Sequence, residues 1–421
     1  MNKPVLIDVH RCTDKADIVR ILRAEFESGR WDLPESNSAR ILLKPNFNSD
    51  MIGLTGNTTD LRVIIGLIEI LHERGFRNLV IADGTSSGFI DHEIDVLERL
   101  RVREIGRRYS VDIVDLNEDA YVERATYRGA AVRIARTVMD SDFLINLPKL
   151  KTHGEARMSA ALKNLVGCVV GLDKQTIHES LIENIVWLSE QIRSDLVIVD
   201  GIVGMEGLGP SLGTPIDTNL LLISNNAYAV EYACASLQGY DDPSDLPVIQ
   251  EMLARGKYRS DEQTAVDSID FAQFARPFVK KRVGRLARVL NVAWLRRAIV
   301  RLRYLALVRR AVRIRFLAWC LRALGLRQDV FVQEDAVVHS LRYTGGQETR
   351  DRFRNVCPMG IDPGSEPDGD LDCIRCMYCY FALPEGAIGL EGDLGHMNYQ
   401  LRRYRAHIGS PRVPAKFPKE S

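Results

Sequence analysis

The chain lacks several features that would assign it to a common class of protein. Its 421 residues contain no uncharged apolar run that approaches the ~20 residues of a membrane-spanning helix. The opening residues meet charge too early for the apolar core of a secretory signal, so we expect none. There is also no G-x-G-x-x-G fingerprint, because Pro210 follows the glycine-rich stretch 201–209 where a helix should begin. We therefore predict no nicotinamide site.

A disulfide framework is also missing. Of the eight cysteines, four lie between positions 357 and 379, a distribution that fits a metal site in a reducing compartment. The sequence therefore predicts a cytoplasmic protein. We expect the other four to be small buried apolar residues. These are Cys12, Cys168, Cys234 and Cys320.

Acidic residues are absent from one long stretch. Between Phe271 and Gln328 there are sixteen Lys and Arg and no Asp or Glu, which leaves 40 basic against 56 acidic residues elsewhere. Arg alternates there with Leu, Val, Ile and aromatic residues. Residues 280–327 could lie on an anionic membrane at its inner face, or pack within the protein or an oligomer. Nucleic acid is the least favoured partner, because a phosphate-tracking face needs fewer large apolar residues.

Apolar runs of strand length alternate with helix-length amphipathic segments over the first 240 residues. This alternation predicts an α/β fold with a mostly parallel sheet and helices on both faces. The expected strands cover 5–9, 40–44, 78–83, 111–115, 143–146, 195–200 and 220–224, and the expected helices cover 15–28, 61–74, 92–108, 178–191 and 226–237. We expect four regions: an α/β domain (1–270), a basic helical insertion (271–328), a ferredoxin-like segment (329–408) and a disordered tail (409–421).

Three cysteines in the spacing C-x₂-C-x₂-C mark the ferredoxin-like segment. One iron–sulfur cluster can be ligated by Cys373, Cys376 and Cys379. The fourth thiolate can come from Cys357, which belongs to the only Cys-Pro pair of the chain. The stretch resembles half of a two-cluster ferredoxin in which Leu383 replaces the usual Cys before Pro. We therefore predict one four-iron, four-sulfur cluster (4Fe-4S). The alternative is zinc, which the third evenly spaced cysteine disfavours.

Polar residues gather at the ends of the expected strands, where ligands bind in parallel sheets. Lys149, Lys151 and His153 alternate along an extended segment, so their side chains can share one face. With Lys44 and Lys163 they could form a pocket for a phosphate, a carboxylate or a phosphorylated cofactor. The alternative is a set of surface lysines beside a structural histidine.

Other strand-end residues could complete this pocket. Asn46 follows Lys44 after one strand, and Asp83 and Asp200 end two others. The carboxylates could bind a divalent cation or act as acid/base groups. Equally, Asp83 and Asp200 could accept backbone N–H groups and shape their own turns. Glu206, in the glycine-rich stretch, is the better candidate for chemistry.

Four runs carry a resemblance to a known family. They are Lys44-Pro-Asn46, Lys149-Leu-Lys-Thr-His153, Lys163-Asn-Leu-Val-Gly167 and Asp200-Gly-Ile-Val-Gly-Met-Glu-Gly-Leu-Gly-Pro210. Together they resemble the bacterial and archaeal family known as domain of unknown function number 362, many of whose members carry a ferredoxin-like segment. The resemblance implies an α/β domain coupled to an iron–sulfur cluster and implies no particular reaction. A distant similarity to nickel-pincer lactate racemases maps no cofactor-attachment residue onto this chain.

The sequence thus favours an iron–sulfur oxidoreductase. Its cluster would exchange electrons between a donor or acceptor protein and an anionic small molecule in the α/β domain. Lys149, Lys151 and His153 would hold the anion, and Glu206 or His153 would supply protons. Two alternatives stay open: an electron-carrier or scaffold subunit without substrate chemistry, and a non-redox enzyme with a structural cluster.

Overall fold

The computed structural model describes residues 4–280, 331–363 and 373–408. Most of the expected basic insertion and all of the expected tail lie outside these ranges. The strands are β1 (Ile7–Arg11), β2 (Ile41–Lys44), β3 (Leu79–Asp83), β4 (Asp112–Asp115), β5 (Tyr121–Ala125), β6 (Ala131–Ala135), β7 (Phe143–Asn146), β8 (Lys149–His153), β9 (Arg157–Ser159), β10 (Leu196–Glu206), β11 (Thr214–Ser224), β12 (Val337–Tyr343) and β13 (Ile388–Asp393).

The helices of the described residues range from single turns to thirteen residues. They are α1 (Lys15–Glu27), α2 (Leu61–Glu73), α3 (Ser87–Asp91), α4 (Val96–Arg99), α5 (Val102–Tyr109), α6 (Arg136–Met139), α7 (Ala161–Asn164), α8 (Lys174–Glu179), α9 (Leu181–Gln191), α10 (Ala227–Leu237), α11 (Pro247–Ala254), α12 (Ser260–Asp267), α13 (Phe271–Phe274), α18 (Gln347–Val356), α19 (Tyr378–Ala382) and α20 (Met397–Ile408). Within these ranges no helix combines the length and apolarity needed to cross a membrane.

The main sheet has the strand order β1-β11-β10-β7-β2-β3-β4 in the described residues. The strands from β10 to β4 are parallel, whereas β11 and β1 add an antiparallel edge and β8 extends the sheet beside β10. The expected α/β fold with a mostly parallel sheet is therefore confirmed.

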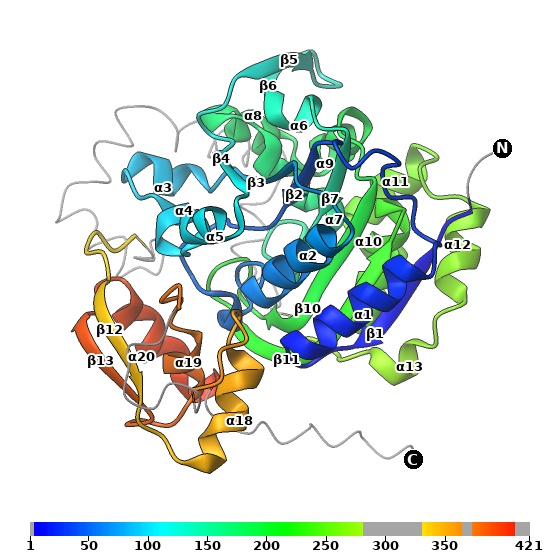
Figure 1. The fold of residues 1–421 in the computed structure, drawn as a ribbon. Coiled ribbons are helices and arrows are strands. Elements are labelled where there is room, and N and C mark those ends of the chain that lie inside the picture. Colours follow the sequence, from blue (N-terminus) through cyan, green and yellow to red (C-terminus); the bar gives the residue numbers. More distant parts are fainter. Residues whose placement is uncertain (1–3, 281–330, 364–372, 409–421) are drawn as a thin grey trace.

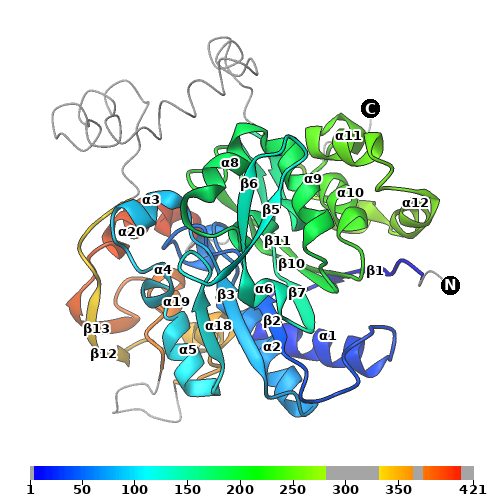
Figure 2. The same cartoon turned by 90° about the horizontal axis from the view of Figure 1, so that it is seen from above.

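Helices cover both faces of this sheet, with α1 and α2 on one side and α9 and α10 on the other (Figure 2). Successive strand residues point to opposite faces. Leu43 and Ile145 therefore lie in the core under α1 and α2, while Leu42 and Leu144 lie in the core under α9 and α10. Two apolar layers fix the sheet from both sides and hold its strand ends in place.

Several expected elements differ from the structure. The expected helix 92–108 is three short helices, α3, α4 and α5, and Arg101 between the last two has a left-handed φ of 63° that a continuous helix cannot include. The expected strand 195–200 continues to Glu206, and the expected strand 220–224 begins earlier, at Thr214. The expected helix 178–191 begins at Leu181, after the short helix α8, and the first strand begins at Ile7 rather than at residue 5.

The C-terminal segment packs on the α1/α2 side of the sheet (Figure 1). Strands β12 and β13 pair antiparallel, and Leu341, Phe353 and Phe381 join the same apolar core as α2. Polar contacts add to this packing, since the Arg62 guanidinium donates to the Asn355 carbonyl at 3.2 Å. The segment is therefore held against the α/β domain through a shared core.

Candidate functional site

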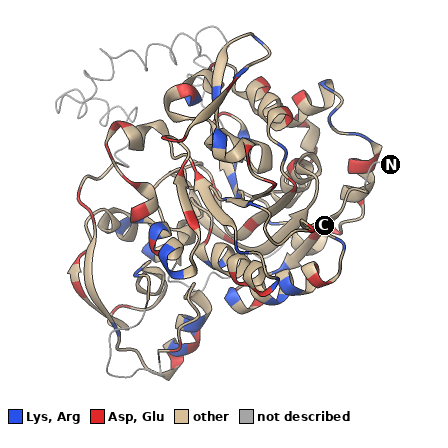
Figure 3. Cartoon of the chain, turned by 45° about the horizontal axis from the view of Figure 1, so that its top comes forward, with Lys and Arg blue, Asp and Glu red and all other residues tan. Residues whose placement is uncertain are grey.

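The carboxyl ends of the parallel strands bring charged side chains together. Lys44 ends β2 and is paired in register with Asn146 at the end of β7, while Asp83 ends the neighbouring β3. Asp200 of β10 is paired with Lys149 of β8. Figure 3 shows both signs of charge around the central strands as well as on the outer helices. Because these strands run in the same direction, residues far apart in the sequence meet at one edge.

Lys44 and Asp83 form a buried ion pair at this edge. The Lys44 Nζ lies 2.6 Å from Asp83 Oδ1, and the other carboxylate oxygen accepts the backbone N–H of Phe47 at 2.5 Å. Both side chains are almost fully buried. A Cβ on Gly167 would lie 2.1 Å from Asp83 Oδ1, so only glycine lets the backbone approach this pair.

A second buried ion pair joins Lys149 and Asp200. The Lys149 Nζ lies 2.7 Å from Asp200 Oδ2, which also accepts the backbone N–H of Asp60 at 2.7 Å. Asp60 caps α2 and receives two parallel bonds from Arg62, at 3.1 and 2.9 Å. Burial raises the pKa of Asp200, with Asp60 adding to the rise and Lys149 opposing it. Burial would also raise the pKa of Asp60, but Arg62 holds it below its usual range.

Two further lysines at this edge, Lys151 and Lys163, have strongly lowered pKa values. The Lys151 Nζ donates to Asn46 Oδ1, Asn48 Oδ1 and the Asn57 carbonyl at 2.7 to 2.9 Å, all of them neutral acceptors. Burial, reinforced by Lys163 and Lys149, lowers the pKa of Lys151 well below its usual value. Burial likewise lowers the pKa of Lys163 to about 8. An anion bound beside these two lysines would stabilise their protonated forms, so this edge of the sheet suits an anion.

We call this group the lysine cluster. Its members lie around the carboxyl edge of the sheet, and all but the partly buried Asn46 and Lys163 are buried. It comprises Lys44, Asn46, Asp60, Arg62, Asp83, Lys149, Lys151, Lys163 and Asp200.

The structure places His153 and Glu206 in contacts with other segments. The His153 Nδ1 accepts the backbone N–H groups of Glu155 and Ala156, each at 3.1 Å, in the turn between β8 and β9. The Glu206 carboxylate accepts the backbone N–H of Val279 at 2.7 Å and so fixes the segment that leads into the basic stretch. Both side chains already accept backbone N–H groups, and either one would have to transfer protons while keeping these hydrogen bonds.

The four cysteines of the C-terminal segment line one small cavity. Cys357 follows α18, Cys373 and Cys376 lie in the loop before α19, and Cys379 lies within α19. We call them the cysteine cage. Their thiols are close enough to interact electrostatically, and burial raises the pKa of each. The remaining cysteines of the described residues, Cys12, Cys168 and Cys234, are buried in the α/β domain as expected.

Backbone N–H groups approach the sulfur atoms of the cage. The N–H groups of Met359, Gly360 and Ile361 are directed at Cys357, and that of Arg375 lies 3.4 Å from Cys373 Sγ. Such donors stabilise thiolates and tune iron–sulfur clusters. Left-handed φ angles at Arg375 and Met377 turn the loop tightly between the cysteines. The donor set, the shared cavity and the N–H groups all fit an iron–sulfur cluster.

Tyr378 joins the cysteine cage to the lysine cluster. Its hydroxyl accepts the backbone N–H groups of Gly53 at 3.2 Å and Leu61 at 3.1 Å. Leu61 follows Asp60, whose own N–H binds Asp200. Burial, with Asp60 adding to it, raises the pKa of Tyr378 well above its usual value. A residue between two cage cysteines therefore contacts the start of α2 directly.

Sequence reasoning missed three residues of this arrangement. Asp60 and Arg62 were missed, although an Asp at the start of the expected helix 61–74 with an Arg two positions later was a usable signal. Tyr378 offered no signal, because its partner Leu61 is 317 positions away. Only the folded chain brings them together.

Comparisons with known proteins identify the family of the α/β domain. Residues 41–236 match the family model described as domain of unknown function (DUF362). The chain is 30% identical to the thylakoid-associated protein sll1697 of Synechocystis sp. over 237 residues, covering 51% of this chain and 68% of that protein.

One solved structure, the lactate racemase apoprotein of Thermoanaerobacterium thermosaccharolyticum, matches with 9% identity and a TM-score of 0.38 over 55% of this chain. The match spans 56% of that structure's chain, little more than half of its length. The similarity in sequence over most of sll1697, together with the family model, assigns the protein: it belongs to the DUF362 family.

Proposed function

We propose that this protein is an iron–sulfur oxidoreductase. In this proposal the cysteine cage holds one 4Fe-4S cluster, and the lysine cluster holds the anionic substrate or cofactor that exchanges electrons with it. The observation that carries the proposal is the convergence of four cysteines, one of them sixteen positions upstream of the rest, on one cavity.

The sequence spacing of the cage favours a cluster over zinc. Structural zinc sites usually pair two Cys-x₂₋₄-Cys units. Here a third evenly spaced cysteine follows the first two, which is the ferredoxin spacing in which each thiolate binds a different iron of one 4Fe-4S cluster.

In this proposal, the contact of Tyr378 with the start of α2 connects the cluster to the substrate site. A bound cluster supplies one-electron transfer, and each transfer moves one electron and no atoms. A two-electron reduction of the substrate would then take two transfers from an electron-carrier protein and two protons. An anionic substrate would favour the protonated forms of Lys151 and Lys163, which would then stabilise negative charge as it develops there.

We also propose that the protein contacts a membrane surface. A relative is named a thylakoid-associated protein, and the sixteen basic residues between Phe271 and Gln328 suit anionic headgroups. Residues 281–327 of this stretch lie outside the described ranges. Sedimentation with anionic vesicles tests the contact: binding should weaken as salt rises, and equal binding to neutral vesicles would contradict it.

Anaerobic purification tests the cluster. We expect about four iron and four sulfide per chain and a visible absorbance that bleaches on reduction. Cys376→Ser should lower the iron content, whereas Cys168→Ser, which changes a buried cysteine of the α/β domain, should leave it unchanged. A preparation that contains zinc and shows no visible absorbance would refute the proposal.

A second experiment separates the oxidoreductase from a carrier or scaffold subunit. Native mass spectrometry of the anaerobic protein should detect a retained anionic small molecule that Lys151→Met loses while its iron remains. Lys257→Met, which removes a lysine from a surface ion pair with Glu190, is the matched control. If Lys151→Met changes nothing and Cys376→Ser abolishes function in the cell, the carrier or scaffold alternative replaces the proposal.

A further inference from the structure

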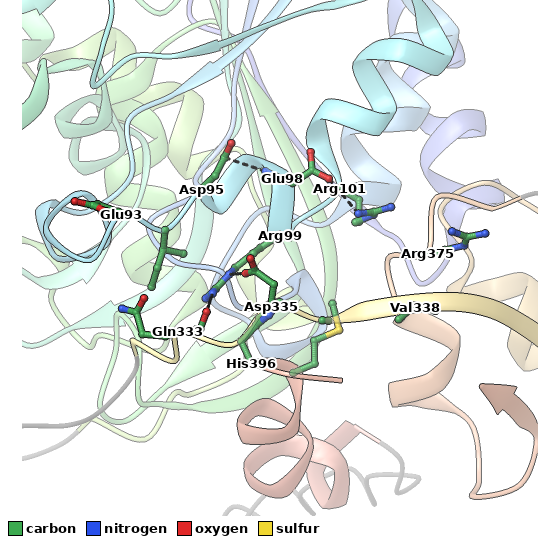
Figure 4. A pocket seen from close by; sticks show the side chains of 13 residues that line it. Glu93, Asp95, Glu98, Arg99, Arg101, Gln333, Asp335, Val338, Arg375 and His396 are labelled. Carbon is green, nitrogen blue, oxygen red and sulfur yellow. Dashed lines mark hydrogen bonds and ion pairs between the residues drawn. The ribbon is translucent and has the colours of Figure 1, made fainter. Parts of the chain in front are cut away.

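A separate cavity of about 210 Å³ lies between α4 and the C-terminal segment. Its wall includes Arg99 and Arg101 from the α/β domain, and Arg375 and His396 from the C-terminal segment (Figure 4). It shares none of its lining residues with the lysine cluster or the cysteine cage. No part of the proposed electron transfer uses it.

His396 gives this cavity an unsatisfied polar group. The residue is 3% exposed, and among the described residues neither of its ring nitrogens has a hydrogen-bond partner. Burial, with Arg99 nearby, lowers the pKa of His396 to about 4, so the ring is neutral at physiological pH. A neutral imidazole offers one donor and one acceptor on separate nitrogens, and a hydroxyl group can bond either of them. Leaving both unpaired costs free energy, so the cavity favours an occupant that bonds at least one of them.

Arg375 provides a positive charge at one end that no carboxylate of the described residues pairs with. Figure 4 shows Arg101 and Arg375 on the same side of the cavity and Glu93 on the opposite side. The Arg101 Nε binds the Ile374 carbonyl at 2.9 Å, which holds the two arginine side chains near one another. The Arg375 guanidinium makes no hydrogen bond or ion pair with the described residues, although it is half-buried.

The acidic residues of the wall do not cancel this charge. Asp335 and Glu98 are paired with Arg99 and Arg101, at 2.6 and 3.1 Å. Asp95 is paired with Arg103 at 2.9 Å. The remaining carboxylate of the wall, that of Glu93, lies on the side opposite Arg375 and would repel a second anionic group. The cavity therefore suits one negative charge, placed at the arginine end.

Apolar side chains line the space between these groups, among them Ile94, Val338 and Met397. The volume is below the ~300–1,000 Å³ of pockets for drug-sized ligands, so a dinucleotide or flavin is too large. We infer that this cavity binds a small monocarboxylic acid with an apolar body and a hydroxyl group at its far end. Arg375 and Arg101 bind the carboxylate, and His396 binds the hydroxyl. The occupant touches the loop between Cys373 and Cys376.

Isothermal titration calorimetry of the full chain with two matched probes tests this inference. 4-Hydroxybenzoate carries both groups, and benzoate lacks only the hydroxyl. We expect 4-hydroxybenzoate to bind about tenfold more tightly, and His396→Leu to abolish that difference. Arg375→Gln should weaken both acids about 10- to 100-fold, because it removes a charge-assisted bond.

Two further variants guard against indirect effects. Ala336 lies in the cavity wall just before β12, so Ala336→Trp fills the cavity without changing a charge or a cysteine. This variant should abolish binding of both acids. Arg124→Gln removes an exposed guanidinium from β5 and should change neither affinity. Iron content, measured in every preparation, separates this site from the cage, because binding should not depend on iron. Absence of binding at millimolar acid, equal binding of the two acids, or binding unchanged in Arg375→Gln and Ala336→Trp would each overturn the inference.

Discussion

Removal of one hydroxyl group tests whether the cysteine cage is anchored to the α/β domain through Tyr378. We predict that Tyr378→Phe destabilises the protein while leaving all four cysteines in place. The hydroxyl is the acceptor for two buried backbone N–H groups, those of Gly53 and Leu61. Phenylalanine fills the same space without an acceptor, so both N–H groups lose their partner.

The structure sets the expected magnitude. Each buried donor left unpaired costs about 1–3 kcal/mol, and the phenol no longer has to be stripped of water, so we expect a net loss of about 2–4 kcal/mol. Water cannot easily replace the hydroxyl, because the site is tightly packed: a Cβ on Gly53 would lie 2.5 Å from it. Tyr378 itself is 1% exposed.

Anaerobic denaturant titration measures this loss, followed by far-ultraviolet circular dichroism and by visible absorbance. The control is Tyr343→Phe, because the Tyr343 hydroxyl donates to the Gly346 carbonyl in an exposed turn, where water can replace it. It should cost less than about 1 kcal/mol. A loss below about 0.5 kcal/mol for Tyr378→Phe, with an unchanged denaturant slope, would refute the anchoring role.

Three other changes have defined outcomes. Lys44→Met leaves Asp83 buried without its partner and should cost about 3–5 kcal/mol in denaturant unfolding, and a restored stability in Lys44→Met/Asp83→Leu would show that the lone charge is the cause. Gly167→Ala places a methyl group against Asp83 and should cost about 1–3 kcal/mol in the same assay. Burial raises the pKa of Glu231 from 4.5 to about 7. Because the folded chain therefore keeps a proton that the unfolded chain releases, stability should fall by about 3 kcal/mol as pH rises from 4.5 to 7. Glu231→Gln should remove this slope.

The sequence was sufficient for the fold because the relevant signals are local. Strand-length apolar runs such as Ile41–Leu43 and helix caps such as Asp60 act within a few residues. The β5–β6 hairpin was missed because most of its first strand is exposed and its apolar pattern is weak. The break at Arg101 was missed because nothing in the residue type requires a left-handed φ.

The candidate sites depend on contacts between distant residues. The strand ends were predictable, since parallel strands bring their carboxyl ends to one edge, but the pairing partners were not. Lys151 was expected just after the end of the strand 143–146, but it lies in the middle of β8, and its three neutral acceptors come from the loop 46–57. The cysteine spacing was readable, whereas the cavity beside Arg375 needs β12, α4 and α20 together.

The buried charges of the lysine cluster bear on function because they do not serve stability well. A buried ion pair is at best neutral relative to well-packed apolar residues of similar volume, and a buried cation without a counter-charge is costly. Lys151 donates to three neutral acceptors, and burial lowers the pKa of both Lys151 and Lys163, so the unliganded protein disfavours the protonated form of each lysine. An anion bound at the carboxyl edge of the sheet would favour those protonated forms and so remove this cost. A lysine that takes up a proton as the anion binds would also stabilise a group that becomes more negative when it is reduced.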